Sequence, residues 1–170
     1  MADKGVKKLW APWRMAYISR LGGKDEGCIF CSKPKSDKDR DNLILYRGKH
    51  AYVIMNLYPY NNGHSMVIPY KHTSDFTDLN DEEMLEIMQL VKKTINVFKK
   101  VFNPEGFNTG FNLGRAAGAG ISQHIHFHIL PRWVGDTNFM PVIGETRVIS
   151  EHIHDTYDKL KAAFDEEESG

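Results

Sequence analysis

The stretch Ser122-Gln123-His124-Ile125-His126-Phe127-His128-Ile129-Leu130-Pro131-Arg132-Trp133 decides how this chain is interpreted. Successive side chains of a β-strand point to opposite faces of the sheet, so an extended segment over 123–130 would separate apolar residues from imidazoles. The apolar face would hold Ile125, Phe127 and Ile129, and the other face His124, His126 and His128. Such a ridge can be the polar face of a half-buried strand, a three-histidine metal site or a nucleophilic site. Catalytic metal sites usually draw their third ligand from another segment, which weakens the metal alternative.

A run of small residues precedes the histidines. Gly118, Ala119 and Gly120 lie in the stretch 112–121, whose backbone can approach a ligand closely and offer N–H groups to anionic oxygens. Taken alone, this composition also fits a plain flexible loop. Beside the histidines it favours a phosphate held by backbone amides within reach of an imidazole, which can attack phosphorus and form a covalent intermediate.

The composition is that of an ordinary globular chain. Of the 170 residues, 41% are hydrophobic and 26% charged, and 22 Lys and Arg balance 22 Asp and Glu. This balance leaves no positive field to attract nucleic acid. No apolar run reaches the ~18–20 residues of a membrane span, and the start lacks the apolar stretch of a secretory signal. We therefore expect a cytoplasmic protein with neither a nucleic acid nor a membrane as partner.

The order of patterns along the chain predicts the fold class. Residues 81–102 keep apolar residues at helical spacing, opened by Asn80 with Glu83 three residues on and closed by Asn103. The same spacing over 153–164 predicts a C-terminal helix. Short extended segments are expected at 42–46, 51–57, 65–68, 106–112 and 123–130. These elements predict one α+β domain with an antiparallel sheet of about five strands, one long helix and a C-terminal helix.

Two stretches look less compact than the rest. Residues 32–42 are expected to form a surface loop, and the acidic tail from Asp165 a frayed end.

Cys28 and Cys31 are the two cysteines of the sequence, spaced Cys-x-x-Cys. Two cysteines are too few for a disulfide scaffold. With two suitably placed histidines they would suffice for a closed, tetrahedral zinc site of the structural kind. Thiols without a metal remain an alternative, and a redox pair is a poorer one because no strand-helix-strand unit surrounds them.

The run His124-Ile-His126-Phe-His128-Ile-Leu130 resembles the signature of the histidine-triad (HIT) family. Two further landmarks of that family occur in order, Cys28-Ile-Phe-Cys31 and Gly63-His64-Ser65-Met66-Val67-Ile68-Pro69. The likeness covers a core over 27–133 and implies a single HIT-like domain over 1–170. An N-terminal arm (1–26) and a C-terminal extension with a helix (134–170) flank that core. Residues 9–18 and 131–139 are similar to the branch of diadenosine tetraphosphate phosphorylases and hydrolases.

The resemblance implies nucleotidyl transfer at the α-phosphate of a dinucleoside polyphosphate such as diadenosine tetraphosphate. The middle histidine of the family signature is the nucleophile, so His126 would form a nucleotidyl-histidine intermediate that water or inorganic phosphate resolves. His128 matches the family's phosphate-contacting histidine and His64 the histidine that supports the site. The positions expected to bind the nucleotide are Asn56, Asn112, Gly118, Ala119, Gly120, Ser122, Gln123 and His128.

Relatives that contain zinc take their other two ligands from the positions of His72 and His124. The resemblance therefore implies a structural zinc held by Cys28, Cys31, His72 and His124, and it also implies a homodimer. Three alternatives stay open for the function. They are a purine nucleoside phosphoramidase with the same nucleophile, a nucleotide-binding sensor with little turnover, and a metal-dependent hydrolase.

Overall fold

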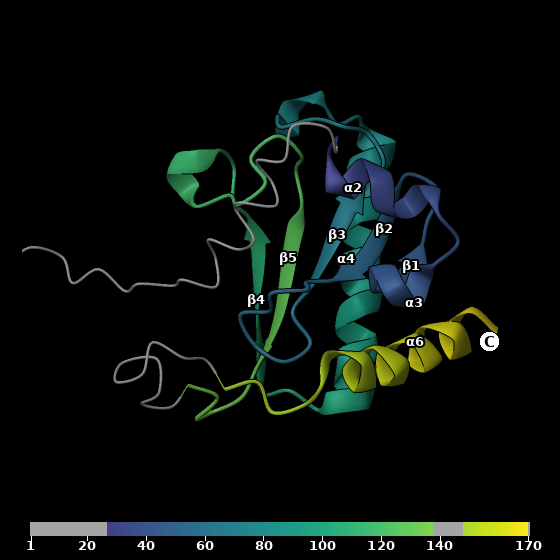
Figure 1. Ribbon diagram of the computed structural model, residues 1–170, viewed down its shortest axis with the longest axis vertical. Coiled ribbons are helices and arrows are strands. Elements are labelled where there is room, and N and C mark those ends of the chain that lie inside the picture. Colours follow the sequence, from purple (N-terminus) through teal and green to yellow (C-terminus); the bar gives the residue numbers. More distant parts are fainter. Residues whose placement is uncertain (1–26, 138–147, 170) are drawn as a thin grey trace, which may run out of the picture. The chain divides into compact units, whose positions relative to one another are not determined.

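The computed structural model describes residues 27–137 and 148–169 (Figure 1). The predicted N-terminal arm and the part of the predicted C-terminal extension at 138–147 lie outside these described residues. Residues Gly27–Asp136 and Ile149–Gly170 form one compact unit, which carries every element discussed below. Among the described helices, none is both long and apolar enough to cross a membrane.

The strands form one five-stranded sheet in the order β1-β2-β3-β5-β4, with every neighbouring pair antiparallel. Their bounds are β1 Ile44–Arg47, β2 Ala51–Met55, β3 Ser65–Pro69, β4 Gly106–Phe111 and β5 Phe127–Arg132. Although β5 is the last strand in the chain, it lies between β3 and β4, where His128 pairs with Met66 on one side and Gly110 on the other. The predicted α+β class and five-stranded antiparallel sheet are confirmed.

The long helix α4, Asp81–Phe102, has the predicted bounds and covers one face of the sheet (Figure 1). Its capping box is complete, because Asn80 Oδ1 accepts from the N–H of Glu83 and Glu83 Oε2 accepts from the N–H of Asn80, both at 2.9 Å. Phe98 of α4 stacks on Phe107 of β4 with ring centroids 6.4 Å apart. Phe107 pairs with Pro131, so the side chains of these two residues point to the same face of the sheet. Because side chains alternate along a strand, His128, three residues before Pro131, points to the opposite face, which α4 leaves open.

The C-terminal helix α6, Ile153–Ser169, packs beside α4 and β1. It buries Tyr157, Leu160 and Phe164. The acidic tail from Asp165 is thus helical, and the expectation of a frayed end was wrong. Lys100 Nζ of α4 donates to Glu167 Oε1 at 2.8 Å, an ion pair that helps to hold the last turns of α6.

The predicted surface loop at 32–42 is also largely helical. It contains the end of α2 (Ile29–Ser32), a 3₁₀ turn (Lys33–Lys35) and α3 (Asp39–Asn42). The guanidinium of Arg47 donates to the carbonyl oxygens of Pro34 and Ser36, both at 2.7 Å, and pairs with Asp39 at 2.6 Å. The loop prediction was wrong because a side chain of β1, outside the segment, organises these turns.

Strand β5 begins at Phe127, four residues later than predicted. The N–H of Ile125 donates to the carbonyl of Thr73, beyond the end of β3, at 2.7 Å, which takes the chain out of the regular ladder. Consequently His124 and His126 lie in an irregular segment and His128 alone of the three lies within the strand. The expected ridge of three histidines on one strand is corrected accordingly.

Candidate active site

A pair of buried histidines connects the start of β3 to β5. His64 Nε2 and His128 Nδ1 are 2.9 Å apart. The backbone N–H of Tyr60 lies 3.1 Å from His64 Nδ1, and because an amide N–H can only donate, this ring nitrogen accepts. His64 therefore carries its proton on Nε2 and donates it to His128 Nδ1. A neutral His128 must then hold its own proton on Nε2, so the pair has fixed tautomers and presents an N–H donor at its far end.

His126 has the opposite arrangement. Its Nδ1 lies 2.8 Å from the carbonyl oxygen of His124, which can only accept. The proton of His126 is therefore on Nδ1, and Nε2 keeps its lone pair. The ring centroids of His126 and His128 are 4.8 Å apart, and the two ring planes make a T-shaped contact at 77°. A free Nε2 next to an N–H donor is the arrangement that attack on an anionic phosphorus centre requires.

Burial keeps the triad histidines neutral. Desolvation lowers the pKa of His124 and of His126 below the usual value of a histidine. Desolvation, followed by the charge of His126, lowers the pKa of His128 to about 4. At neutral pH the lone pair of His126 is therefore available for attack.

Cys28, Cys31, His72 and His124 form a cluster whose four ligand atoms all lie within 4.8 Å of one another. Nε2 of His124 is 2.9 Å from the carbonyl of Pro69, so the proton of His124 is on Nε2 and its Nδ1 lone pair faces the cluster. This Nδ1 is 3.2 Å from Cys28 Sγ, 3.5 Å from Cys31 Sγ and 3.3 Å from His72 Nδ1. Ligands held tetrahedrally at zinc–nitrogen and zinc–sulfur bond lengths would be about 3.3–3.8 Å apart. The donors and their spacing fit a bound metal ion.

Asn56 and Asn112, predicted to bind the nucleotide, lie at the ends of strands around the histidines. Asn56 Nδ2 is 3.3 Å from His64 Nδ1, and Asn56 Oδ1 accepts from the N–H of Tyr58 at 3.0 Å. Asn112 directly follows β4, whose last residue, Phe111, pairs with Phe127, the residue after His126. Both asparagines are half-buried, and the side chain of Asn56 borders the site through its contact with His64.

The small-residue stretch forms an exposed connection between β4 and β5 with a short turn at Arg115–Ala117. Gly118 has a φ of +89°, a left-handed conformation that favours glycine. The N–H groups of Gly118 and Ala119 donate within this turn to Arg115 and Gly114, at 3.0 and 3.3 Å. Two amides of the predicted phosphate cradle are thus engaged in the turn itself. The other predicted residues of the stretch are exposed or half-buried: Gly120, Ser122 and Gln123.

Two aromatic residues that contact the histidines were missed by sequence reasoning. The ring of Tyr60 stacks on His64 with centroids 4.8 Å apart at 28°. The ring of Phe30 lies 5.6 Å from that of His124 and 5.2 Å from that of His126. The position of Phe30 between the two cysteines was the available signal, whereas Tyr60 lies in a turn-rich stretch without one.

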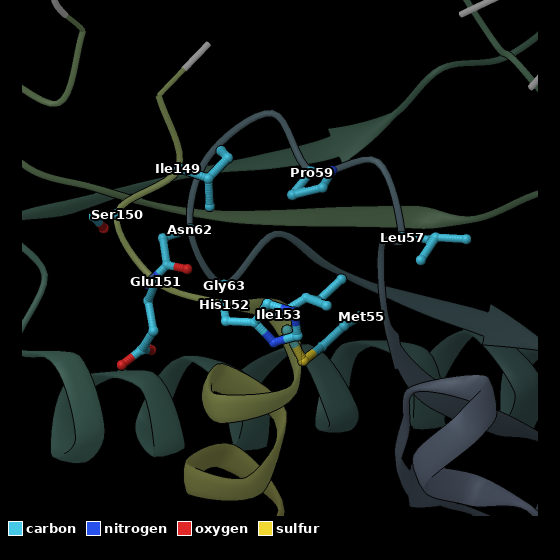
Figure 2. Close-up of a pocket in the computed structure, with 10 residues that line it drawn as sticks. All are labelled: Met55, Leu57, Pro59, Asn62, Gly63, Ile149, Ser150, Glu151, His152 and Ile153. Carbon is cyan, nitrogen blue, oxygen red and sulfur yellow. The ribbon is translucent and has the colours of Figure 1, made fainter. Parts of the chain in front are cut away.

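A cavity of about 480 Å³ lies between the β2–β3 connection and the beginning of α6 (Figure 2). Leu57, Pro59 and Ile153 are among its mainly apolar walls. Its lining residues include none of the predicted site residues, so the candidate active site is a different place on this unit.

Comparison with known proteins identifies relatives of this chain. The profile of the HIT domain matches residues 37–134. An AP-4-A phosphorylase of Mycobacterium tuberculosis is 41% identical over 166 residues, which cover 91% of this chain and 85% of the relative. The adenosine 5'-monophosphoramidase hnt1 of Schizosaccharomyces pombe is 35% identical over 105 residues, 62% of this chain and 74% of that protein.

Solved structures share the fold. The crystal structure of a zinc-bound histidine triad family protein from Mycobacterium smegmatis matches with a TM-score of 0.68 and 26% identity, over 84% of this chain and 96% of that one. The matched domain profile spans more than half of the present sequence and includes all five strands, His64 and the three alternating histidines. The chain therefore belongs to the HIT domain family.

Proposed function

We propose that this protein cleaves dinucleoside polyphosphates such as diadenosine tetraphosphate at an α-phosphate, through a nucleotidyl group carried on His126. The observation that carries the proposal is the hydrogen bond from His126 Nδ1 to the His124 carbonyl, which leaves Nε2 as a neutral nucleophile. The similarity to an AP-4-A phosphorylase over 91% of the chain supports this class of substrate.

In the first step, Nε2 of His126 forms a bond to the α-phosphorus while the bond from phosphorus to the bridging oxygen breaks. The electron pair leaves with that oxygen, and diadenosine tetraphosphate releases ATP. The His126 ring keeps its Nδ1 proton and becomes positively charged, so its hydrogen bond to the His124 carbonyl becomes charge-assisted. The Nε2–H of His128, held in place by His64, donates to a phosphate oxygen as negative charge develops there.

We propose that inorganic phosphate is the second acceptor. An ionised phosphate oxygen attacks the α-phosphorus, the nitrogen–phosphorus bond breaks, ADP leaves and His126 returns to its neutral form. This oxygen needs no base, whereas an attacking water would have to give up a proton and would yield AMP. The name of the 41% identical relative, a phosphorylase, supports phosphate as the acceptor.

The nucleotide would be held by the residues around the histidines. Asn56 is proposed to bind the ribose, and Asn112 to contact the phosphates. Gly120, Ser122 and Gln123 would donate the remaining phosphate contacts, and Gly118 and Ala119, whose own amides donate within the turn, would shape the backbone beside them. The contact of Asn56 with His64 and the position of Asn112 next to the Phe111–Phe127 pair support these roles.

We propose that the four-residue cluster holds zinc in a structural role. Two thiols and two imidazoles at tetrahedral spacing support this assignment, as does the zinc-bound family structure. When bound, the metal would tie α2 to the segment that carries His124 and take no part in the bond changes. Neither thiol forms a disulfide bond. A reducing compartment such as the cytoplasm would keep both thiols reduced.

We further propose that the protein is one HIT-like domain per chain and acts as a homodimer. Strand β4 is at the edge of the sheet, and its residues Asn108 and Thr109 are exposed. An edge strand with exposed residues offers backbone groups to which a second copy can pair.

A single-turnover reaction with α-phosphate-labelled diadenosine tetraphosphate tests the proposal. Wild type, His126→Ala and the control His50→Ala, which replaces a histidine outside the site, are quenched at alkaline pH with and without inorganic phosphate. Label is expected on wild type and the control but not on His126→Ala, whose rate should fall on the order of 10³-fold or more.

The products distinguish the alternatives. ADP formed only in the presence of phosphate would support a phosphorylase. AMP as the product would show that water, and not phosphate, is the second acceptor. Turnover of adenosine phosphoramidates alone would favour the phosphoramidase, for which the similarity to hnt1 is the supporting observation. Cleavage by His126→Ala at the wild-type rate would overturn the role of His126. Tight binding of the dinucleotide without turnover would favour the nucleotide-binding sensor.

A further inference from the structure

Phe30 lies between the metal cluster and the proposed nucleophile. The residue is 4% exposed and belongs to α2, between Cys28 and Cys31. The ring meets that of His124 edge-on at 87°, with centroids 5.6 Å apart, and that of His126 at 54° and 5.2 Å. One apolar side chain thus touches both a predicted metal ligand and the residue proposed to attack the substrate.

The position of this ring depends on groups outside α2. A helix of four residues is a single turn, which is too short to be stable by itself in water. The carbonyl of Phe30 accepts a hydrogen bond from Tyr52 Oη at 2.7 Å, and Tyr52 is completely buried in β2. On the other side, Cys28 and Cys31 face His124 in the cluster. A metal ion bound there would cross-link α2 to the segment that precedes β5.

His126 needs such support because it lies just outside the regular strand. The hydrogen bond from Nδ1 fixes one edge of its ring, but the plane of the ring is set by the side chains packed against it. Those include Phe30 and His128. A small rotation of this imidazole would move Nε2 away from the line of attack, and misplacements of about 1 Å can cost roughly 100-fold in rate.

We propose that Phe30 is a positioning residue that holds the imidazole of His126 in its attacking orientation. A metal ion in the cluster fixes α2, and Phe30, as part of α2, thereby fixes the ring of His126. The inference rests on the proposed role of His126. The metal then affects the chemical step through packing, without contacting the substrate.

The test compares Phe30→Leu with a matched control. Phe164→Leu makes the same substitution at a completely buried phenylalanine of α6, whose ring stacks on Tyr46 at 6.0 Å. Metal content per chain, Tm, kcat and KM for diadenosine tetraphosphate are measured for each. Phe30→Leu should keep its metal and its KM while kcat falls about 10- to 100-fold. Phe164→Leu should keep kcat although its Tm falls, and Phe30→Tyr, which retains the ring, should recover most of the loss.

Metal removal is a second, independent test. Stripping the metal from wild type should lower kcat by about the same factor as Phe30→Leu, and stripping it from Phe30→Leu should add little, because both changes act on the same contact. Solvent exchange of the His126 Nδ1 proton, followed by ¹H–¹⁵N NMR, reports on the ring without any turnover. That proton should exchange slowly in metal-loaded wild type and faster after either change.

Several results would overturn the inference. These are an unchanged kcat in Phe30→Leu, an equal loss in Phe164→Leu, and a raised KM with unchanged kcat, which would make Phe30 a wall of the nucleotide pocket. Independent, multiplicative losses from mutation and metal removal would also refute it. A wild type that turns over no dinucleotide, yet protects the His126 proton in a Phe30-dependent way, would refute the proposed function and support the inference.

Discussion

Acidification is expected to destabilise the fold through His128. Burial, followed by the charge of His126, lowers the pKa of His128 from 6.5 to about 4. The unfolded chain therefore binds this proton more readily than the folded chain at every pH between these two values. The stability that the neutral, buried imidazole contributes is complete above pH 6.5 and is lost as the pH falls toward 4.

The size of this effect follows from the shift. One pKa unit corresponds to about 1.4 kcal/mol, so the full shift is worth about 3 kcal/mol, of which about 2 kcal/mol is lost by pH 5. This is a large share of the roughly 5–15 kcal/mol that stabilises an ordinary domain. Burial lowers the pKa of His126 as well, so its loss adds in the same direction.

The assay is urea unfolding of wild type and His128→Asn at pH 7, 6 and 5. The asparagine oxygen can replace Nδ1 of His128 as acceptor for the His64 Nε2–H, and it does not titrate. Metal released by acid affects both proteins and cancels in the comparison. The stability advantage of wild type over the variant should shrink by about 2 kcal/mol between pH 7 and pH 5. Parallel curves of unfolding free energy against pH would show that protonation of His128 does not cause the loss of stability.

Three further changes probe the site. Cys31→Ser should lower the zinc content well below one per chain and reduce Tm, as measured by atomic absorption and thermal melting. An unchanged zinc content and an unchanged Tm would exclude a structural zinc site. His64→Phe removes the donor to His128 Nδ1 and should lower kcat on the order of 100-fold with little change in KM. If the ¹⁵N chemical shifts of His128 showed an unaltered tautomer, they would contradict the proposed hydrogen bond from His64. Tyr52→Phe leaves the buried carbonyl of Phe30 without this donor and should cost about 1–2 kcal/mol in urea unfolding. A variant as stable as wild type would show that another group satisfies the carbonyl.

The secondary structure was predictable wherever its determinants are local. The apolar spacing of α4, its capping box at Asn80 and Glu83 and its stop at Asn103 act within a few residues, and the helix has the predicted bounds. The segment at 32–42 shows the opposite case. Its helical turns depend on Arg47, whose guanidinium reaches back to Pro34 and Ser36 once β1 is in place. Composition alone indicated a loop because the organising charge lies outside the segment.

The beginning of β5 was misplaced for a related reason. Alternation of apolar residues and histidines continues unbroken from His124 to Ile129, so periodicity alone extends the strand through all of them. The structure ends the ladder at Phe127 because Ile125 bonds to Thr73, which the chain brings alongside only after folding.

By itself, the sequence determined the chemical groups of this protein: an alternating set of histidines, a Cys-x-x-Cys pair, and a likeness strong enough to name a family. The tertiary structure decided which nitrogen of each imidazole is free, since the partners that fix the tautomers are Tyr60 for His64, Pro69 for His124 and the backbone of His124 for His126. It also decided that Phe30 packs against the nucleophile. Several of these partners lie far apart along the chain. His64 and His128 are 64 residues apart, and Phe30 still farther from His126, so these contacts form only when the folded sheet and α2 bring them together.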